Sequence, residues 1–328
     1  MLQKKRNLSI DVVKIVAMFG VIMLHTTHDF MSASGWDVAS FLYKSSVVSI
    51  PLFFTVSGYL LLGREDISYR YVFNKILSIG RYVVIFCLIY WIFRGLTAEW
   101  IPIYRIIKNS LLGQGQLFAF WYFSALCLVY LFLPLINRLF RNNLKIFIWC
   151  WLLCFLIQNL IFTYNVLTGT PEINAVFRLY NWIGYFMLGG VLKSRKFHRC
   201  PIFLITIAFC LNFIFQTIIV YKIHTNYCSF FYSSAIVILL VSIVFNYISQ
   251  SDFSHNPWAI RELSKLFLIV FSIHPLFLEP VYKVLGGVEL SSYLSLFAIV
   301  NFSVVSILSV GTGYLIMQLP YANKIFRI

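Results

Sequence analysis

The chain has 328 residues, of which 60% are hydrophobic and 11% are charged, whereas soluble domains carry about 25% charged residues. The mean hydropathy of +0.84 and the long apolar runs exclude an ordinary soluble domain. The formal net charge is +15, but the basic residues lie between apolar runs and no basic-domain signature is present, so we expect no nucleic-acid partner. We assign these charges to cytoplasmic loops that face anionic lipid.

The seven cysteines lie mostly inside apolar runs, and no CxxC or Cys/His cluster has metal-ligand spacing. We therefore predict neither a metal site nor a disulfide framework. The basic start is followed by an apolar run, as in a signal peptide, but Asp11 and Lys14 interrupt that run and no small-residue cleavage site follows it. We expect this segment to be retained as the first membrane helix.

Apolar runs of the length that crosses a hydrocarbon core, about 20 residues, recur along the whole chain. They fall at about 9–30, 44–62, 76–94, 117–137, 146–164, 178–192, 201–221, 229–248, 264–283 and 293–316. No linker and no internal repeat of the kind found in transporters separates them. The sequence predicts one all-α domain over residues 1–328, a polytopic bundle of about ten transmembrane helices.

The loop charges give the orientation of this bundle. If the N-terminus is cytoplasmic, most lysines and arginines fall in inner segments, among them Arg138 and Arg141, and only a minority, such as Lys44 and Lys222, fall outside. Inner loops are the ones enriched in Lys and Arg. We therefore predict that both termini are cytoplasmic.

Ionisable groups within a membrane span are costly, so each is a candidate functional residue. The first span holds Asp11, Lys14 and His25. Lys14 and His25 are eleven residues apart, which places them on one helix face, roughly 16 Å apart along the axis. Lys14 would hold an anionic group and His25 would transfer a proton, since histidine changes charge near physiological pH. Alternatively, Lys14 only reaches to the interface and His25 is a hydrogen-bonded core residue.

Three further residues lie in later spans. Ser57 precedes Gly58 in an apolar run, where it either packs the helices closely or turns its hydroxyl toward the first span. His274 precedes Pro275, which bends a helix, so His274 forms either a second wall of a site or a core contact with a backbone carbonyl. Trp121 lies near a predicted interface and is either an interface residue or part of a site.

The first two spans together carry a pattern of Lys14, ten residues and His25, followed by Phe53-Phe54-Thr55-Val56-Ser57-Gly58-Tyr59. This pattern resembles the integral-membrane acyltransferase-3 family, which has Arg or Lys, ten residues and His in its first helix and a Phe-Phe-x-x-Ser-Gly-Tyr signature. Asp11 matches the family's upstream acid, and the Trp121 segment and His274 are weaker matches. The resemblance covers essentially the whole chain.

The resemblance implies a membrane-embedded O-acyltransferase that moves an acetyl group from cytoplasmic acetyl-CoA to a hydroxyl of a bacterial surface glycan or its lipid-linked precursor. The chain is most similar to compact members that O-acetylate surface glycans such as enterobacterial common antigen. The catalytic residues would be His25, Asp11, Ser57 and His274, with His25 either a general base or a transient acyl carrier. The donor would contact Lys14, Arg70, Lys75, Arg81 and Trp121.

One departure concerns the donor contacts. Many family members have Arg-x-x-Arg after the second helix, whereas Arg70, Lys75 and Arg81 lack that spacing here. The implied location is the bacterial cytoplasmic (inner) membrane, with membrane lipids and a lipid-linked or exported glycan as partners and a homo-oligomer as one option. Two other classes stay open: a transporter or flippase with a His/Lys relay, and a structural membrane scaffold.

Overall fold

The computed structural model describes residues 7–97, 100–195, 197–223, 228–285 and 294–320. Twelve α-helices occur in this part of the chain, and it contains no strand. They are α1 (Leu8–Thr27), α2 (Val38–Ser45), α3 (Ser49–Leu61), α4 (Tyr69–Thr97), α5 (Ile103–Leu111), α6 (Trp121–Asn142), α7 (Leu144–Thr168), α8 (Leu179–Ser194), α9 (Ile202–Ile223), α10 (Ala235–Ser249), α11 (Pro257–Leu285) and α12 (Leu294–Gln318). Short 3₁₀ turns join several of them.

The prediction of an all-α membrane bundle is confirmed, and each predicted span falls on a helix. Within the described residues, eight helical segments are long and apolar enough to cross a membrane; α2 and α3 together form one of them. Helices α8 and α10 have only 16 and 15 residues, which is short of the roughly 20 that a full crossing needs. The predicted position of the termini lies outside the described residues.

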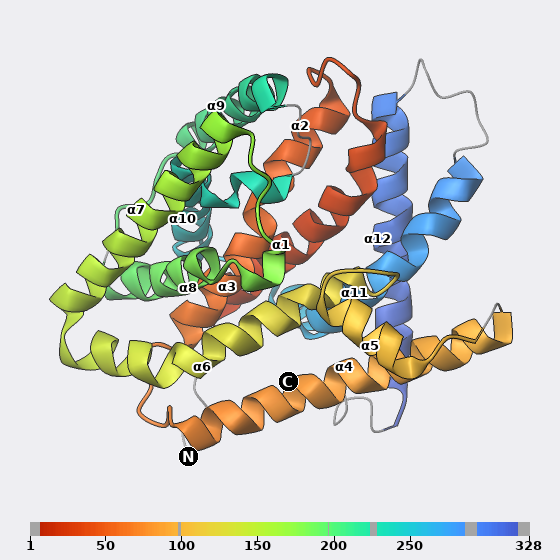
Figure 1. Cartoon of the computed structure of the whole chain (residues 1–328), viewed down its shortest axis with the longest axis horizontal. Helices are drawn as coiled ribbons and strands as arrows, with labels where there is room; N and C mark the ends of the chain where they lie inside the picture. Colours follow the sequence, from red (N-terminus) through yellow and green to blue (C-terminus); the bar gives the residue numbers. More distant parts are fainter. Residues whose placement is uncertain (1–6, 98–99, 196, 224–227, 286–293, 321–328) are drawn as a thin grey trace.

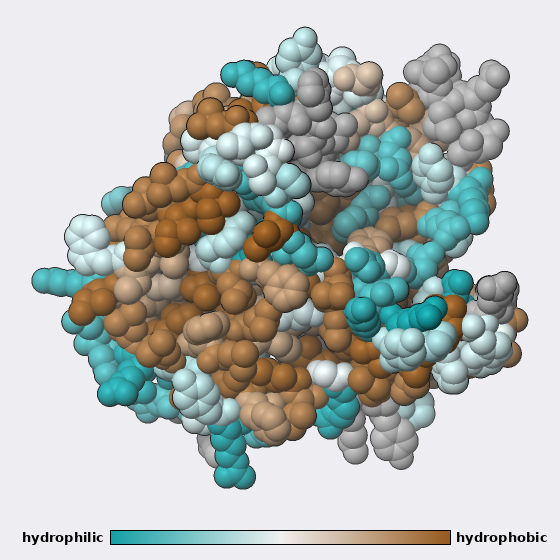
Figure 2. All heavy atoms as spheres, in the orientation of Figure 1, coloured by the Kyte–Doolittle hydropathy of each residue, from teal (hydrophilic) through white to brown (hydrophobic). Residues whose placement is uncertain are grey.

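Helix α1 runs through the middle of the bundle. Figure 1 shows α3 and α8 on one side of it and α11 and α12 on the other, and α1 contacts α3, α11 and α12 directly. Along α4, α7, α9 and α12, by contrast, many large apolar side chains are exposed. Figure 2 shows the corresponding broad hydrophobic surface, with hydrophilic residues gathered at the lower left and the upper right. The outer helices therefore face lipid, whereas α1 packs against helices on both sides.

Helices α3 and α8 approach each other unusually closely because glycines face each other. A Cβ atom on Gly58 would lie 1.8 Å from the carbonyl oxygen of Phe186, and one on Gly189 would lie 2.1 Å from that of Thr55. Small residues allow such backbone approach in membrane bundles. The packing interpretation of the Ser57-Gly58 pair therefore holds for Gly58, and the contact fixes where α3 presents Ser57.

Candidate functional site

The N-terminal end of α1 carries the first polar groups of the site. The side chain of Asn7 caps the helix by accepting from the amide nitrogens of Ser9 at 3.1 Å and Ile10 at 3.4 Å, which satisfies two of the free donors of the first turn. Asp11 then lies buried in that turn, where a negative charge suits the helix dipole. Its Oδ1 is 3.4 Å from Nζ of Lys14. The ion pair holds the Lys14 ammonium at the wall of a cavity.

Two adjoining hollows, here called the inner cavity, meet at Lys14. Their volumes are about 940 Å³ and about 470 Å³. Both are lined by Lys14, Ser57, Leu60, Lys75 and Tyr130. The inner cavity thus extends from the start of α1 into the bundle, and its walls join α1, α3, α4 and α6.

The structure separates the four basic residues predicted to contact the donor into two groups. Lys14 and Lys75 line the inner cavity, whereas Arg70 and Arg81 lie on the exposed surface of α4 and do not line it. Ser57 does line the inner cavity, and its hydroxyl donates to the carbonyl of Phe53 at 2.9 Å. This bond uses the hydroxyl hydrogen, so the two lone pairs of the Ser57 oxygen can still accept a hydrogen bond from a group in the cavity.

Two basic residues of the inner cavity were not singled out from the sequence. Arg64 lies in the turn after α3, paired with Asp66 through its Nε and Oδ1 atoms at 2.9 Å. Lys193, near the end of α8, donates to the carbonyl of Leu62 at 2.5 Å. Both line the wider hollow together with Lys14 and Lys75. Only the pairing of α3 with α8 brings Lys193 there, and sequence order does not reveal that pairing.

At the other end of α1, His25 lines a separate hollow of about 490 Å³, here called the outer cavity. Trp121 lies on the same lining, so it is near His25 and far along the bundle from Lys14. The His25 ring packs edge-on against Phe118 with centroids 4.7 Å apart. It stacks on His274 with centroids 5.6 Å apart and the two planes 22° apart. The two predicted histidines therefore meet.

Pro275 explains which ring nitrogen of His274 carries a hydrogen. Proline has no amide hydrogen, so the carbonyl of Phe271, four residues earlier, loses its helical hydrogen bond. Nδ1 of His274 lies 2.7 Å from that carbonyl oxygen, and only a protonated Nδ1 satisfies it. In the neutral ring Nε2 is then the acceptor nitrogen; it is buried and has no hydrogen-bond partner within the described residues. His274 thus contacts a backbone carbonyl, and its ring also lies beside that of His25.

A layer of aromatic rings separates the inner cavity from the histidines. Phe53 and Tyr122 line the inner cavity, and their ring centroids lie 5.7 Å and 5.5 Å from that of Phe271. Phe271 in turn lies 6.0 Å from His274. The order from one end to the other is thus inner cavity, aromatic layer, His274, His25 and outer cavity.

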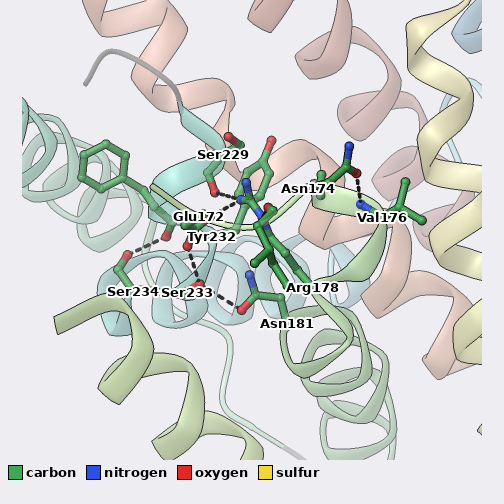
Figure 3. Close-up of polar contacts among 12 residues, drawn as sticks. Glu172, Asn174, Val176, Arg178, Asn181, Ser229, Tyr232, Ser233 and Ser234 are labelled. Atoms are coloured by element: carbon green, nitrogen blue, oxygen red, sulfur yellow. Dashed lines mark hydrogen bonds and ion pairs between the residues drawn. The ribbon is translucent and has the colours of Figure 1, made fainter. Parts of the chain in front are cut away.

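The wall of the outer cavity opposite α1 is supported by a buried ion pair between Glu172 and Arg178 (Figure 3). Ser233 donates to Glu172 at 3.2 Å and to Asn181 at 3.0 Å, and Arg178 donates to the carbonyl of Ser229 at 2.8 Å. Burial raises the pKa of Glu172 to about 7, against the opposing effects of Arg178 and Ser233. The network was not predicted, because its two segments are far apart in sequence.

These features define a polytopic membrane protein with a histidine pair between two cavities. A comparison with family models matches an acyltransferase domain over residues 7–318, so the chain belongs to the acyltransferase-3 family. Searches of curated proteins and of solved structures each gave no match. The family-level resemblance is thus confirmed, and the protein is a membrane acyltransferase.

Proposed function

We propose that this protein transfers an acetyl group from cytoplasmic acetyl-CoA to a hydroxyl of a bacterial cell-surface glycan or its lipid-linked precursor, in the cytoplasmic membrane. The observation that carries the proposal is the histidine pair between two cavities on opposite ends of α1. A donor that enters from one side and an acceptor that enters from the other would meet at His25.

The inner cavity suits the donor. Its wider hollow is lined by four bases and three acids, an excess of one positive charge: Lys14, Arg64, Lys75 and Lys193 against Asp11, Glu65 and Asp66. Coenzyme A presents phosphates on a long thin arm, and lysine meets phosphate as a point charge. The phosphates would stay among these bases at the membrane surface. The arm would reach inward over the roughly 16 Å that separates Lys14 from His25, once the rings of Phe53 and Tyr122 move aside.

The chemistry at His25 is an ordinary acyl transfer. A ring nitrogen of His25 takes the proton of the acceptor hydroxyl while the oxygen of that hydroxyl attacks the thioester carbonyl. The carbon–sulfur bond breaks, the thiolate of coenzyme A leaves, and the proton on His25 passes to that sulfur. A variant of the route forms an acyl-His25 first, and the acceptor oxygen then displaces the histidine. His274, with Nδ1 held by Phe271, would position the His25 ring in either route.

The test uses purified full-length protein with acetyl-labelled acetyl-CoA and a glycan extract of the source membrane. Transfer to glycan and release of free coenzyme A are both measured. His25→Ala abolishes transfer, whereas His255→Ala, at an exposed loop histidine, leaves it unchanged. Full transfer by His25→Ala would refute the catalytic assignment. If the wild-type protein itself becomes acetyl-labelled and His25→Ala does not, the reaction proceeds through the acyl-histidine route.

The same preparation tests the transporter alternative. Reconstituted vesicles are assayed for uptake of the lipid-linked glycan without acetyl-CoA. The proposal predicts no uptake that depends on His25. Uptake with no acetyl transfer to any acceptor would assign the protein to transport instead.

A further inference from the structure

A further histidine, His28, lies one helical turn beyond His25. It follows the last residue of α1 and keeps helical backbone angles, with φ −53° and ψ −50°. Residues three apart are neighbours on one helix face, with roughly 5–6 Å between their Cβ atoms. His25 and His28 both line the outer cavity, and the charges of His28 and Asp29 act on His25. The outer cavity therefore has two imidazoles on one wall, of which the proposed reaction uses one.

Asp29 fixes which ring nitrogen of His28 carries a hydrogen. Its Oδ1 lies 2.7 Å from Nδ1 of His28. A carboxylate only accepts hydrogen bonds, so the neutral ring holds its hydrogen on Nδ1 and its lone pair on Nε2. The carboxylate also stabilises the imidazolium that forms when Nε2 takes a proton. A histidine oriented in this way by a carboxylate is the arrangement expected of a general base.

The pair lies where an acceptor enters. The ring of Tyr43, a buried residue of α2, packs edge-on against the His28 ring, with centroids 5.1 Å apart and planes 62° apart. The side chains of His28 and Asp29 nevertheless stay 34% and 58% exposed. An ion pair with this exposure adds little to stability. The pair is thus held in place and is reachable by a hydroxyl that arrives from outside the bundle.

The other titratable groups suit the role of a second base less well. Within the described residues, those that share the lining of the outer cavity with His28 are His25, Asp29 and Tyr43. A phenol keeps its proton at neutral pH, and a carboxylate is a much weaker base than an imidazole. His274 does not line this cavity. His28 is therefore the base available to the acceptor whenever His25 is occupied.

The acyl-histidine route occupies His25. A ring nitrogen of neutral His25 attacks the thioester carbonyl, the carbon–sulfur bond breaks, and coenzyme A leaves as a thiolate. The ring keeps its N–H hydrogen and becomes an acyl-imidazolium, so one nitrogen holds the acetyl group and the other holds hydrogen. The acceptor hydroxyl must still lose its proton as its oxygen attacks the acetyl group. A second base on the acceptor side speeds that step.

We propose that His28, oriented by Asp29, is the general base for the acceptor hydroxyl, while His25 carries the acetyl group. This inference rests on the proposed function and selects its acyl-histidine route. The acceptor oxygen attacks the acetyl carbonyl, its proton passes to Nε2 of His28, the carbon–nitrogen bond breaks, and His25 returns as a neutral imidazole. His28 then gives the proton to water on the outer side, and the thiolate of coenzyme A takes one from water on the inner side.

The experiment separates the two half-reactions by rapid quenching of the full-length protein in detergent. Acetyl-labelled acetyl-CoA is added first, and the label on the protein is measured. Glycan extract is added next, and the transfer of the label from protein to glycan is followed. His28→Gln gains the label at the wild-type rate but passes it to glycan about 100-fold more slowly, which is the scale of general base catalysis. Asp29→Asn slows the same step by a smaller factor.

Hydroxylamine distinguishes a base from a structural residue. Its nitrogen attacks as a neutral amine with a lone pair and needs no prior loss of a proton, so it removes the label from His28→Gln as fast as from the wild type. Matched controls are His255→Gln and Asp252→Asn, at exposed residues that line neither the inner nor the outer cavity. Both controls gain and pass on the label as the wild type does.

Three results would overturn the assignment of His28 while leaving the proposed function in place. These are wild-type transfer to glycan by His28→Gln, slower labelling of the His28→Gln protein together with slower removal by hydroxylamine, and transfer by the wild type without any labelled protein. A wild-type protein that neither becomes labelled nor acetylates any glycan is a different result, because the proposed function then fails and the role of His28 fails with it.

Discussion

Gly58→Ala tests whether the close contact of α3 with α8 organises the bundle. The added Cβ would lie 1.8 Å from the carbonyl oxygen of Phe186 and 2.7 Å from its carbonyl carbon. Ordinary contact begins at 3.4 Å, so the two backbones must separate by more than an ångström. Both atoms are backbone, and no side chain can rotate away. Over-packing of this kind costs about 1–3 kcal/mol, and more where the backbone itself must move.

Gly80→Ala is the matched control. Gly80 lies in α4 with nothing within 4 Å of an added Cβ, so alanine there gains helix propensity and stabilises by about 0.5–1 kcal/mol. The two variants carry the same chemical change in opposite surroundings. We therefore expect opposite signs: Gly58→Ala unfolds at lower temperature than the wild type and Gly80→Ala at the same or higher temperature.

The assay follows thermal unfolding of the purified variants in detergent by size-exclusion chromatography of heated samples. Acetyl transfer is measured on the fraction that stays folded. Because α3 also carries Ser57 into the inner cavity, Gly58→Ala lowers transfer even where the protein is folded. If Gly58→Ala matches Gly80→Ala in both measurements, the contact does not have the tightness described here and the reasoning is wrong.

Three further outcomes are expected. Lys14→Ala raises KM for acetyl-CoA more than tenfold while Arg70→Ala does not, because Lys14 lines the inner cavity and Arg70 does not; steady-state kinetics check this. Arg178→Gln lowers the free energy of unfolding by about 3–5 kcal/mol at pH 8.5 and by less at pH 5.5. The pKa of the Glu172 carboxyl is raised to about 7, so Glu172 needs the Arg178 cation only at the higher pH, where it is ionised. Melting curves at both pH values measure the difference. Asp37→Ala removes the side-chain cap of α2, which is worth about 1 kcal/mol. The loss of stability shrinks as pH falls from about 4 toward 2, because hydrogen bonds from Ser32 and Ser40, acting against burial, lower the pKa of Asp37 to about 2 and the wild type then loses the charged carboxylate; unfolding measured across that pH range tests it.

Much of the fold follows from the sequence because the membrane restricts it. Backbone groups in lipid must be satisfied within a helix, so each long apolar run became a helix. The short helices α8 and α10 are the exceptions in length, since protein neighbours enclose much of their surface. Length alone does not tell a helix that crosses lipid from one that is held inside a bundle.

The site was predictable where one helix carries it. Asp11, Lys14 and His25 lie on α1, so helical spacing alone placed them relative to one another. The meeting of His25 with His274 depends on the packing of α11 against α1, which no local pattern determines. The positions of Arg64 and Lys193, and the exposure of Arg70 and Arg81, depend in the same way on tertiary packing.

The aromatic layer has an electrical consequence. The inner and outer cavities enter from opposite ends of α1, and between them stands a low-dielectric partition made by rings such as Phe53, Tyr122 and Phe271. The membrane potential drops mainly across such a partition, and one charge that crosses the full field gains or loses about 2.3 kcal/mol per 100 mV. A charge that moved across these rings, between Lys14 and His25, would therefore sense the membrane potential.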